Sequence, residues 1–497
     1  MTKTALAGVN FELPASDCIP SEFMDYIHAE WIDRIPRRIS AVIHDDGMEI
    51  HHAYKESLRI VIPWDVEDLG VFFLKTASLR SREKPYDLLM EITRGTVGRL
   101  VDQTENWLSS GVPLSRQILL ELSEIKMLFR DANFSKGSQR HEKANLAISS
   151  SIQLMNRIGD VFSQCILDLR SKDQQPNQAL LGGLFESDSN EVQSDFLKTF
   201  NSAILPIPVQ IPDPSTNPKE LAKKNALTRK KHEEIANHLH QQGVSTCTRP
   251  IIRFNDLKKR QDQTIEEAGN ELLKLSNQLF ELGGSSCKLC YPISGLGYGD
   301  QGSWNDQEQI HLTHELISKM KQARPQVPFI IGLDQPFGEA VLFDPKRKTP
   351  LQLADALVRM GTPLSAFCLE INLGYYPNGS WIRDLYAFND LLDAWAQIDR
   401  PLLVQLRVPG GVQSIDLDFG ELRIAAGANS QASWVKHLFS LAIAKQNVAG
   451  VFYGTLIDHP NDDYFGAGLI TTEGERKPAF QEINKIRQAI EQSANES

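Results

Sequence analysis

The sequence predicts a (β/α)8 barrel, preceded by a small antiparallel β-sheet and a helical segment. After about residue 180, short apolar runs of strand length alternate with amphipathic helical segments, which is the pattern of parallel βα units. Eight such runs fall within about 310 residues, and barrels of this kind usually take about 250 and can exceed 400. A doubly wound open sheet is the alternative. No Gly-x-Gly-x-x-Gly turn follows the first run, so the dinucleotide-binding form of that fold loses its main support.

Composition narrows the class of protein. The 497 residues correspond to two or three domains at about 150 residues each. The 52 Lys and Arg against 63 Asp and Glu give a net charge of −11, so we expect no nucleic-acid partner. No apolar run approaches the roughly 18–20 residues of a membrane span, and the first residues lack the apolar core of a secretory signal. Six cysteines are too few for a disulfide scaffold, which favours a reducing compartment. Together with the missing membrane span and signal, this leads us to expect a cytoplasmic protein without membrane contact.

Residues 1–80 are predicted to be β-rich. The runs Arg38–Ile43, Ser57–Ile62 and Val71–Leu74 have the composition and alternation of strands, and Asp45-Asp46-Gly47 is a turn signal between the first two. These features predict a small antiparallel sheet.

Residues 81–175 are predicted to be helical. Apolar residues at helical spacing mark three helices, near Leu88–Trp107, Leu119–Phe129 and Leu146–Phe162. The polar stretch 171–177 is the best linker candidate, so the barrel is assigned to residues 180–490.

The barrel elements follow in order. The predicted strands are Leu180–Phe185, Ala203–Ile211, Val244–Phe254, Lys288–Ile293, Phe329–Leu333, Ala366–Ile371, Leu402–Val408 and Val448–Leu456. The predicted helices between them are Glu220–His240, Thr264–Leu282, Gln307–Lys321, Pro350–Met360, Asp384–Ala396 and Ser433–Lys445.

The active site of such a barrel lies at the carboxyl ends of its strands. The ends of strands five to eight combine carboxylates, amides, arginine and aromatic rings, which together suit a polyhydroxylated ligand. We predict Glu339 and Glu370 as a catalytic carboxylate pair. The predicted substrate-binding residues are Asp334, Gln335, Asn372, Tyr375, Gln405, Arg407, Tyr453, Asp458 and Trp304, and Tyr376 is a further aromatic candidate for stacking.

Each carboxylate also has a structural interpretation. Glu370 lies inside an apolar strand, where an unpaired charge is costly, so it faces either the mouth or a cation such as Arg407. Glu339 could be a solvated loop residue.

Cys287 and Cys290 have Cys-x-x-Cys spacing but no second pair, so a chance pair is favoured over a metal or redox site. No P-loop, His-Glu-x-x-His or Ser/His/Asp order is present, and we expect neither metal nor cofactor.

The last third of the sequence resembles the family 10 glycoside hydrolases, the xylanase family. The likeness is carried by Phe367–Asn372, by Pro401–Pro409, by Gly450–Thr455 and by the closing Gly474–Phe480 before a final helix. It extends over about 180–490 and is strongest after Pro328. The resemblance implies a barrel acting on O-glycosyl bonds of a β-linked polysaccharide or oligosaccharide.

The family's catalytic residues do not carry over. The acid/base is the Glu of an Asn-Glu pair after strand four, and Cys290–Asp300 contains no Glu; the nucleophile position matches Gln405. The leading hypothesis is therefore a hydrolase with a relocated carboxylate pair. Its rivals are a catalytically inactive carbohydrate-binding or scaffolding barrel, and a barrel for a small metabolite with a divalent metal at Asp334, Glu370 and Asp458.

Overall fold

The computed structural model describes most of the chain. The described residues are 7–15, 18–19, 21–44, 47–52, 56–172, 179–186, 189–206, 218–254, 257, 259, 263–297, 304–344, 346–375, 379–410, 415–417, 420–422, 428–459 and 462–495. Four predicted features lie wholly or partly outside these residues, namely the turn at Asp45–Gly47, the linker at 171–177, the second half of the strand Ala203–Ile211, and Tyr376.

A nine-stranded parallel sheet forms the larger part of the molecule. Its strands are β9 (Leu180–Leu184), β10 (Ser202–Leu205), β11 (Ser245–Thr248), β12 (Ile252–Arg253), β13 (Cys290–Leu296), β14 (Phe329–Asp334), β15 (Ala366–Asn372), β16 (Leu402–Arg407) and β19 (Val448–Tyr453). The order is β11-β10-β9-β19-β16-β15-β14-β13-β12. The predicted class, a parallel β/α sheet of the TIM type, is confirmed at this level.

The two strands at the ends of this order belong to one segment of the chain. We predicted a single strand over Val244–Phe254, whereas the structure has β11 and β12 separated by residues 249–251. Pro250 explains the interruption, because proline has no backbone N–H to donate to a neighbouring strand. An isolated parallel bridge joins Cys247 of β11 to Leu289 beside β13, and Ile251 N donates to Tyr291 O at 2.9 Å. The sheet order therefore begins and ends on the same segment.

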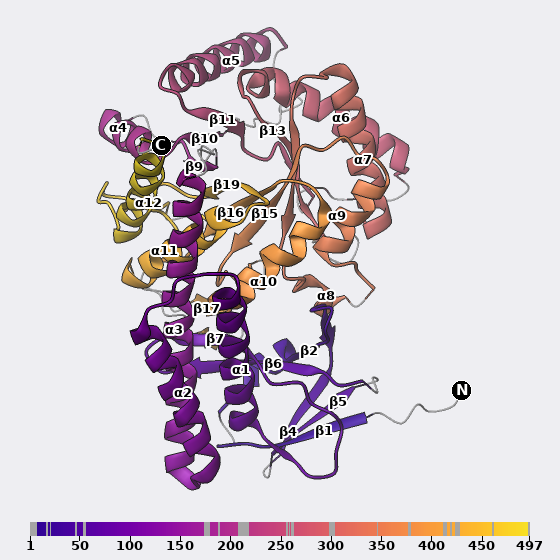
Figure 1. The fold of residues 1–497 in the computed structure, drawn as a ribbon. Coiled ribbons are helices and arrows are strands. Elements are labelled where there is room, and N and C mark those ends of the chain that lie inside the picture. The colour runs from indigo at the N-terminus through magenta and orange to yellow at the C-terminus, as the bar shows by residue number, and fades with distance from the viewer. Residues whose placement is uncertain are drawn as a thin grey trace.

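Helices separate most successive strands and cover the outside of the sheet (Figure 1). The six predicted helices are present as α5 (Pro218–Gln241), α6 (Ile265–Leu282), α7 (Asp306–Ala323), α9 (Pro350–Arg359), α10 (Leu385–Trp395) and α11 (Ala428–Ala444), and the final helix is α12 (Pro478–Asn495). The sequence analysis missed the short helices α4 (Asn190–Thr199) and α8 (Ala340–Phe343) and the hairpin of β17 (Ile415–Leu417) and β18 (Gly420–Leu422). No helix within the described ranges is both long and apolar enough to span a bilayer.

Two four-stranded sheets precede the helical segment. The first, in the order β4-β5-β1-β8, contains β1 (Ala7–Glu12), β4 (Ser40–His44), β5 (Gly47–His52) and β8 (Tyr86–Asp87). The second, in the order β3-β2-β6-β7, contains β2 (His28–Glu30), β3 (Pro36–Arg38), β6 (Arg59–Val66) and β7 (Gly70–Lys75). The prediction of one antiparallel sheet was too simple, because β1 and β8 pair in parallel and strands begin at Ala7.

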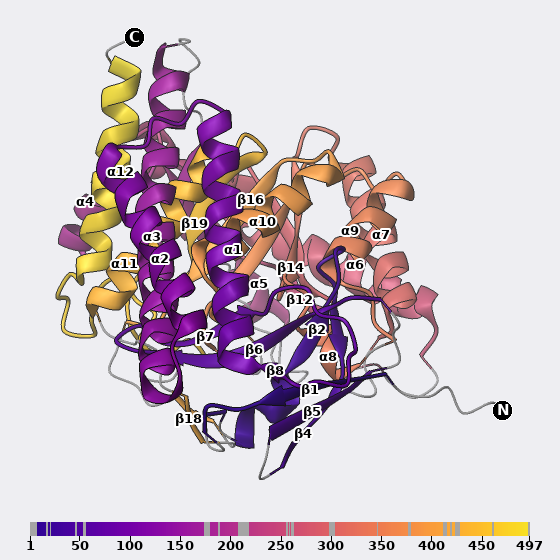
Figure 2. The ribbon, with the colours of Figure 1, turned by 60° about the horizontal axis from the view of Figure 1, so that its bottom comes forward.

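Three long helices stand along one flank of the β/α sheet, as predicted (Figures 1 and 2). They are α1 (Leu88–Ser109), α2 (Arg116–Phe134) and α3 (Gly137–Lys172). Near the end of α3, Arg170 donates to the carbonyl oxygens of Ile443 and Ala444 at 2.8 and 2.9 Å. These bonds satisfy two of the carbonyl groups that lack partners at the carboxyl end of α11.

The second N-terminal sheet packs against the loops that follow β14 and β15. Phe73 of β7 stacks on Trp381 with ring centroids 4.6 Å apart, and Phe73 N donates to Ile382 O at 2.8 Å. Pro36 of β3 lies beside Gly338, where an added Cβ would be 3.3 Å from the proline ring. The N-terminal strands therefore cover part of the carboxyl-terminal side of the sheet, where a barrel has its site.

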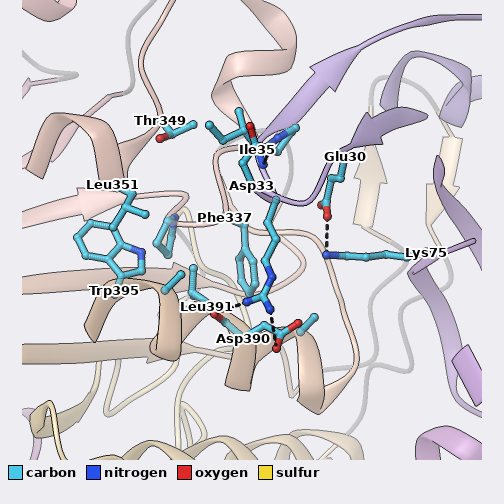
Figure 3. A pocket seen from close by; sticks show the side chains of 15 residues that line it. Glu30, Asp33, Ile35, Lys75, Phe337, Thr349, Leu351, Asp390, Leu391 and Trp395 are labelled. Carbon is cyan, nitrogen blue, oxygen red and sulfur yellow. Dashed lines mark hydrogen bonds and ion pairs between the residues drawn. The ribbon is translucent and has the colours of Figure 1, made fainter. Parts of the chain in front are cut away.

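Buried ion pairs hold this contact together. Glu30 of β2 and Lys75 of β7 point toward each other at 2.5 Å, with both side chains under 10% exposed (Figure 3). Nearby, the buried Asp384 accepts from Arg99 of α1 at 2.9 Å. Burial alone would raise the pKa of Glu30, but the charge of Lys75 and the nearby His28, whose Nε2 lies 3.6 Å from the carboxylate, hold that pKa well below its usual range.

A small pocket lies beside these pairs, between β2, β7 and α10 (Figure 3). Phe337, Leu391 and Trp395 form its apolar wall. Its charged groups are already engaged with each other, since Glu30 pairs with Lys75 and Arg34 lies 3.4 Å from Asp390. We interpret it as part of the contact between the two parts of the chain.

Replacing Glu30 by Gln tests this contact. E30Q leaves Lys75 buried without its carboxylate, and breaking a buried pair in this way costs about 3 kcal/mol or more. We expect urea unfolding at pH 7 to show that loss. Because the pKa of Glu30 is lowered by folding, its contribution is present above the ordinary carboxyl range and is lost as the pH falls below about 4.

The difference in unfolding free energy between E30Q and the wild type should therefore shrink in acid. E233Q on α5 is the control, because its ion pair with Arg229 is exposed and we expect a change under about 0.5 kcal/mol. A constant difference between E30Q and the wild type from pH 7 to pH 3 would contradict this account.

Candidate functional site

The side chains that point inward from the sheet form an apolar layer and a polar layer. The apolar cluster contains Leu184, Ile204, Cys247, Tyr291, Ile330, Ala366, Cys368, Leu403 and Phe452. Two residues beyond Cys368 and Leu403, at the same face of β15 and β16, stand Glu370 and Gln405, which are register partners. Gln405 therefore lies on the inward face of β16. The polar layer thus lies at the carboxyl ends of the strands.

Glu370 is the centre of the polar layer. Its side chain is fully buried, and one carboxylate oxygen accepts from Arg253 of β12 at 3.0 Å. The other oxygen accepts the hydroxyl hydrogen of Tyr291 of β13. A further hydrogen bond joins it to Asp334, its register partner on β14. Three different strands therefore hold one carboxylate.

The pKa values of the two carboxyl groups move in opposite directions. Burial and the neighbouring charge of Glu370 raise the pKa of Asp334 well above its usual value. Burial acts against the charge of Glu370 too, but Arg253 and hydrogen bonds from Asp334 and Tyr291 lower its pKa. These opposite shifts favour the proton on Asp334 and the negative charge on Glu370.

The backbone of β14 at Gly332 passes so close to the carboxyl pair that no side chain would fit there. A Cβ added at Gly332 would be 1.7 Å from the Tyr291 hydroxyl oxygen and 2.7 Å from a carboxylate oxygen of Glu370. Glycine is required there because any side chain would displace the hydroxyl and the carboxylate. The next residue after Asp334, Gln335, has a φ of 47°, which non-glycine residues seldom adopt, and its amide donates to Gly379 O at 3.2 Å. The end of β14 is thereby tied to the loop that follows β15.

A second group surrounds Arg407 of β16. Its guanidinium donates to Asn372 Oδ1 at 2.9 Å and to Thr455 Oγ1 at 3.3 Å, and it lies 4.4 Å from the ring centroid of Tyr464. Asn372 in turn donates to the Tyr464 hydroxyl at 3.2 Å. The Tyr375 ring meets the Tyr464 ring edge-on at 5.3 Å. The structure thus gathers the predicted binding residues Asn372, Gln405 and Arg407 beside the Asp334–Glu370 pair, and Tyr375 joins them through Tyr464.

Glu339 has a different environment from its predicted partner. It is fully buried and accepts from Arg383 at 2.6 Å and from Trp381 N at 3.3 Å, beneath the N-terminal strands. The solvated-loop interpretation of Glu339 is therefore wrong. Its catalytic role stays a prediction, although Asp334 is the carboxyl group in contact with Glu370.

Three further predicted residues have their side chains engaged elsewhere. The hydroxyl of Tyr453 donates to Ala467 O at 2.8 Å, and its ring packs near Phe439 of α11, on the helix side of β19. Trp304 is buried in the core, and Lys259 Nζ lies 5.0 Å from its ring centroid. Asp458 forms an ion pair with Lys477 at 2.6 Å. Their roles in binding remain predictions.

The sequence analysis missed Arg253, Tyr291 and Tyr464. We expected Arg407 as the cation beside Glu370, but the structure pairs Glu370 with Arg253, while Arg407 binds neutral oxygens. Arg253 carried the same signal as Glu370, a charge inside the apolar run Ile251–Phe254. Tyr464 carried none, since it lies in a loop after the last strand.

No group of three or more His, Cys, Asp or Glu side chains within the described ranges is arranged to hold a metal ion. The hypothesis of a metal at Asp334, Glu370 and Asp458 gains no support from these residues, because Asp458 is bound to Lys477.

Comparisons with known proteins concern the fold of the chain. No protein-family model matches the sequence, and no curated protein matches it. Among solved structures, xylanase 10B from Thermotoga maritima shares 13% identity over 65% of this chain and 99% of that chain, with a TM-score of 0.44. The GH53 catalytic domain of Ignisphaera aggregans shares 14% over 62% and 91%, with 0.44, and an endo-1,4-beta-xylanase from Caldicellulosiruptor owensensis shares 12% over 63% and 98%, with 0.43. Similarities this low leave function to be argued from the side chains.

A double-mutant cycle tests the link between Arg253 and Glu370. R253Q leaves Glu370 buried without its cation, and we expect a loss of about 2 to 3 kcal/mol in unfolding free energy, reduced from the fully buried case because Arg253 is 27% exposed. R253Q should also raise the pKa of Glu370, since the cation that lowers it is gone.

The R253Q/E370Q protein should recover part of that loss, because no uncompensated charge remains. R359Q on α9, whose side chain is 78% exposed, is the control and should change the free energy by under about 0.5 kcal/mol. Strictly additive single and double variants would show that the two side chains are not coupled.

Proposed function

We propose that the protein is a carbohydrate-active (β/α)8 barrel that acts on the O-glycosyl bonds of an oligosaccharide or polysaccharide, with Asp334 and Glu370 as its acid and base. The observation that carries this proposal is the pair of adjacent carboxyl groups whose pKa values are driven apart at the carboxyl ends of β14 and β15. Environments that separate two pKa values in this way are how a site keeps one acid and one base at the same pH.

The chemistry assigned to each group follows from its protonation. The neutral Asp334 would donate its proton to the glycosidic oxygen as the carbon–oxygen bond breaks. The ionised Glu370 would accept a proton from the attacking water, whose oxygen bonds to the anomeric carbon. Asn372 and Gln405, with amide donors and acceptors at the same level of the barrel, suit sugar hydroxyl groups. Positioned acid and base groups of this kind contribute about 10²–10⁴-fold each.

The contact between the two carboxyl groups favours a second candidate function. Their hydrogen bond brings them closer than the about 5–5.5 Å of retaining glycosidases or the about 6.5–9.5 Å of inverting ones. Hydrolysis thus requires a ligand oxygen to enter between Asp334 and Glu370. If the pair stays closed, the same polar layer would bind a saccharide without cleaving it, as a catalytically inactive barrel.

Two substitutions test the proposal. D334N and E370Q should each lower the release of reducing ends from a panel of xylan, mannan and glucan by about 10²-fold or more, with smaller changes in ligand affinity. Wild-type turnover should fall as the pH rises through the raised pKa of Asp334, because the acid then loses its proton. E315Q on the exposed face of α7 is the control for differences in protein preparation and folding.

Each candidate function has its own outcome. Turnover that D334N and E370Q leave unchanged would refute the assignment of the pair. Saccharide binding by calorimetry, without any reducing ends from the wild type, would establish the binding protein instead. Loss of turnover in E339Q, with D334N fully active, would make Glu339 the partner of Glu370.

A further inference from the structure

Positive charge at the barrel mouth is not balanced by contact with carboxylates. Arg407 is only 5% exposed, yet its hydrogen bonds go to the neutral oxygens of Asn372 and Thr455. Among the described side chains, neither Arg407 nor Arg249 forms an ion pair, whereas Arg253 is paired with Glu370. A buried guanidinium without a direct ion pair loses hydration, and here it interacts with the charge of Glu370 only across a distance.

The acidic groups near these arginines are occupied. Glu370 binds Arg253 and Tyr291, and burial and the charge of Glu370 raise the pKa of Asp334. Glu186, after β9, accepts from the backbone amides of Leu456 and Ile457 at 3.4 Å. Asp462 accepts from Tyr464 N at 3.2 Å. None of the four is placed as the counter-ion of Arg407.

Arg249 lies in the short segment between β11 and β12, and its side chain is exposed. Partial desolvation and then the positive charges of Arg407 and Arg253 lower the pKa of Arg249, so the three guanidinium groups are near enough to repel one another. Three arginines from β16, β12 and the segment before β12 therefore converge on the mouth of a chain whose net charge is −11. A cluster of positive charges on a molecule of negative net charge is typical of a binding site for an anion.

We propose that the mouth binds an anionic saccharide, with Arg407 and Arg249 holding the carboxylate of a uronic acid residue. The inference rests on the proposed function and names its substrate class. A planar carboxylate suits the fork of N–H donors that a guanidinium presents, and Arg407 keeps donors beyond the two that bind Asn372 and Thr455. The hydroxyl groups of the same sugar would meet Asn372 and Gln405, beside the Asp334–Glu370 pair.

The experiment compares ligands that differ only in charge. Calorimetry would measure wild-type binding of an oligogalacturonide, of the same chain fully methyl-esterified, of a neutral xylo-oligosaccharide of equal length and of a sulfated saccharide. We expect the acid form to bind at least tenfold more tightly than its ester, and this preference to weaken as salt is added. R249Q should reduce the preference about tenfold or more while leaving affinity for the ester within about twofold, and R407Q should reduce the preference at least as much.

R249Q keeps the test decisive if R407Q does not fold, because Arg249 is exposed and lies outside the packed core. R359Q is the matched control, an exposed arginine on α9 away from the mouth. Equal wild-type affinity for acid and ester would overturn the inference, and so would a preference for the sulfated saccharide over the uronate. If the neutral chains bind and E370Q abolishes their turnover, the proposed function stands without this inference; if no saccharide binds, both fail.

Discussion

One buried negative charge organises the carboxyl-terminal side of the parallel sheet. Glu370 sits at the inward face of a strand on which the preceding inward side chains, Ala366 and Cys368, are apolar, and its carboxylate is buried away from solvent. Neutralising it takes Arg253 from one strand, Tyr291 from a second and the proton of Asp334 from a third. The glycine at position 332 follows from the same constraint, because the hydroxyl and the carboxylate occupy the space of its side chain.

The same constraint operates where the N-terminal strands meet the loops of the barrel. Glu30 with Lys75, Asp384 with Arg99, and Glu339 with Arg383 are buried pairs at this contact. Buried pairs tolerate few alternative arrangements, since each partner is costly when left alone. The stacking of Phe73 on Trp381 adds the apolar part. The N-terminal strands are thereby fixed against the side of the sheet on which the candidate site opens.

Periodicity along the sequence was enough to predict the parallel sheet, its six helices and the three long helices before it, because these signals are local. The break between β11 and β12 could have been inferred from Pro250, and the role of Arg253 from its charge within an apolar run. The parallel pairing of β1 with β8 had no local signal, since it joins segments about 75 residues apart. The pairing of Glu339 with Arg383 depends on the same long-range packing, so spacing alone left that carboxyl in the predicted catalytic pair.

A structural role accounts for the buried charges at the N-terminal contact, but not for those at the carboxyl ends of the strands. At the N-terminal contact each acid faces a base, so those pairs account for themselves as elements of the interface. At the carboxyl ends of the strands, two carboxyl groups with opposite pKa shifts stand beside a buried arginine that forms no ion pair with a described carboxylate. Well-packed apolar side chains would commonly stabilise such a position as well or better. Stability therefore gives no reason for this polar layer, whereas ligand chemistry at the carboxyl ends of the strands does.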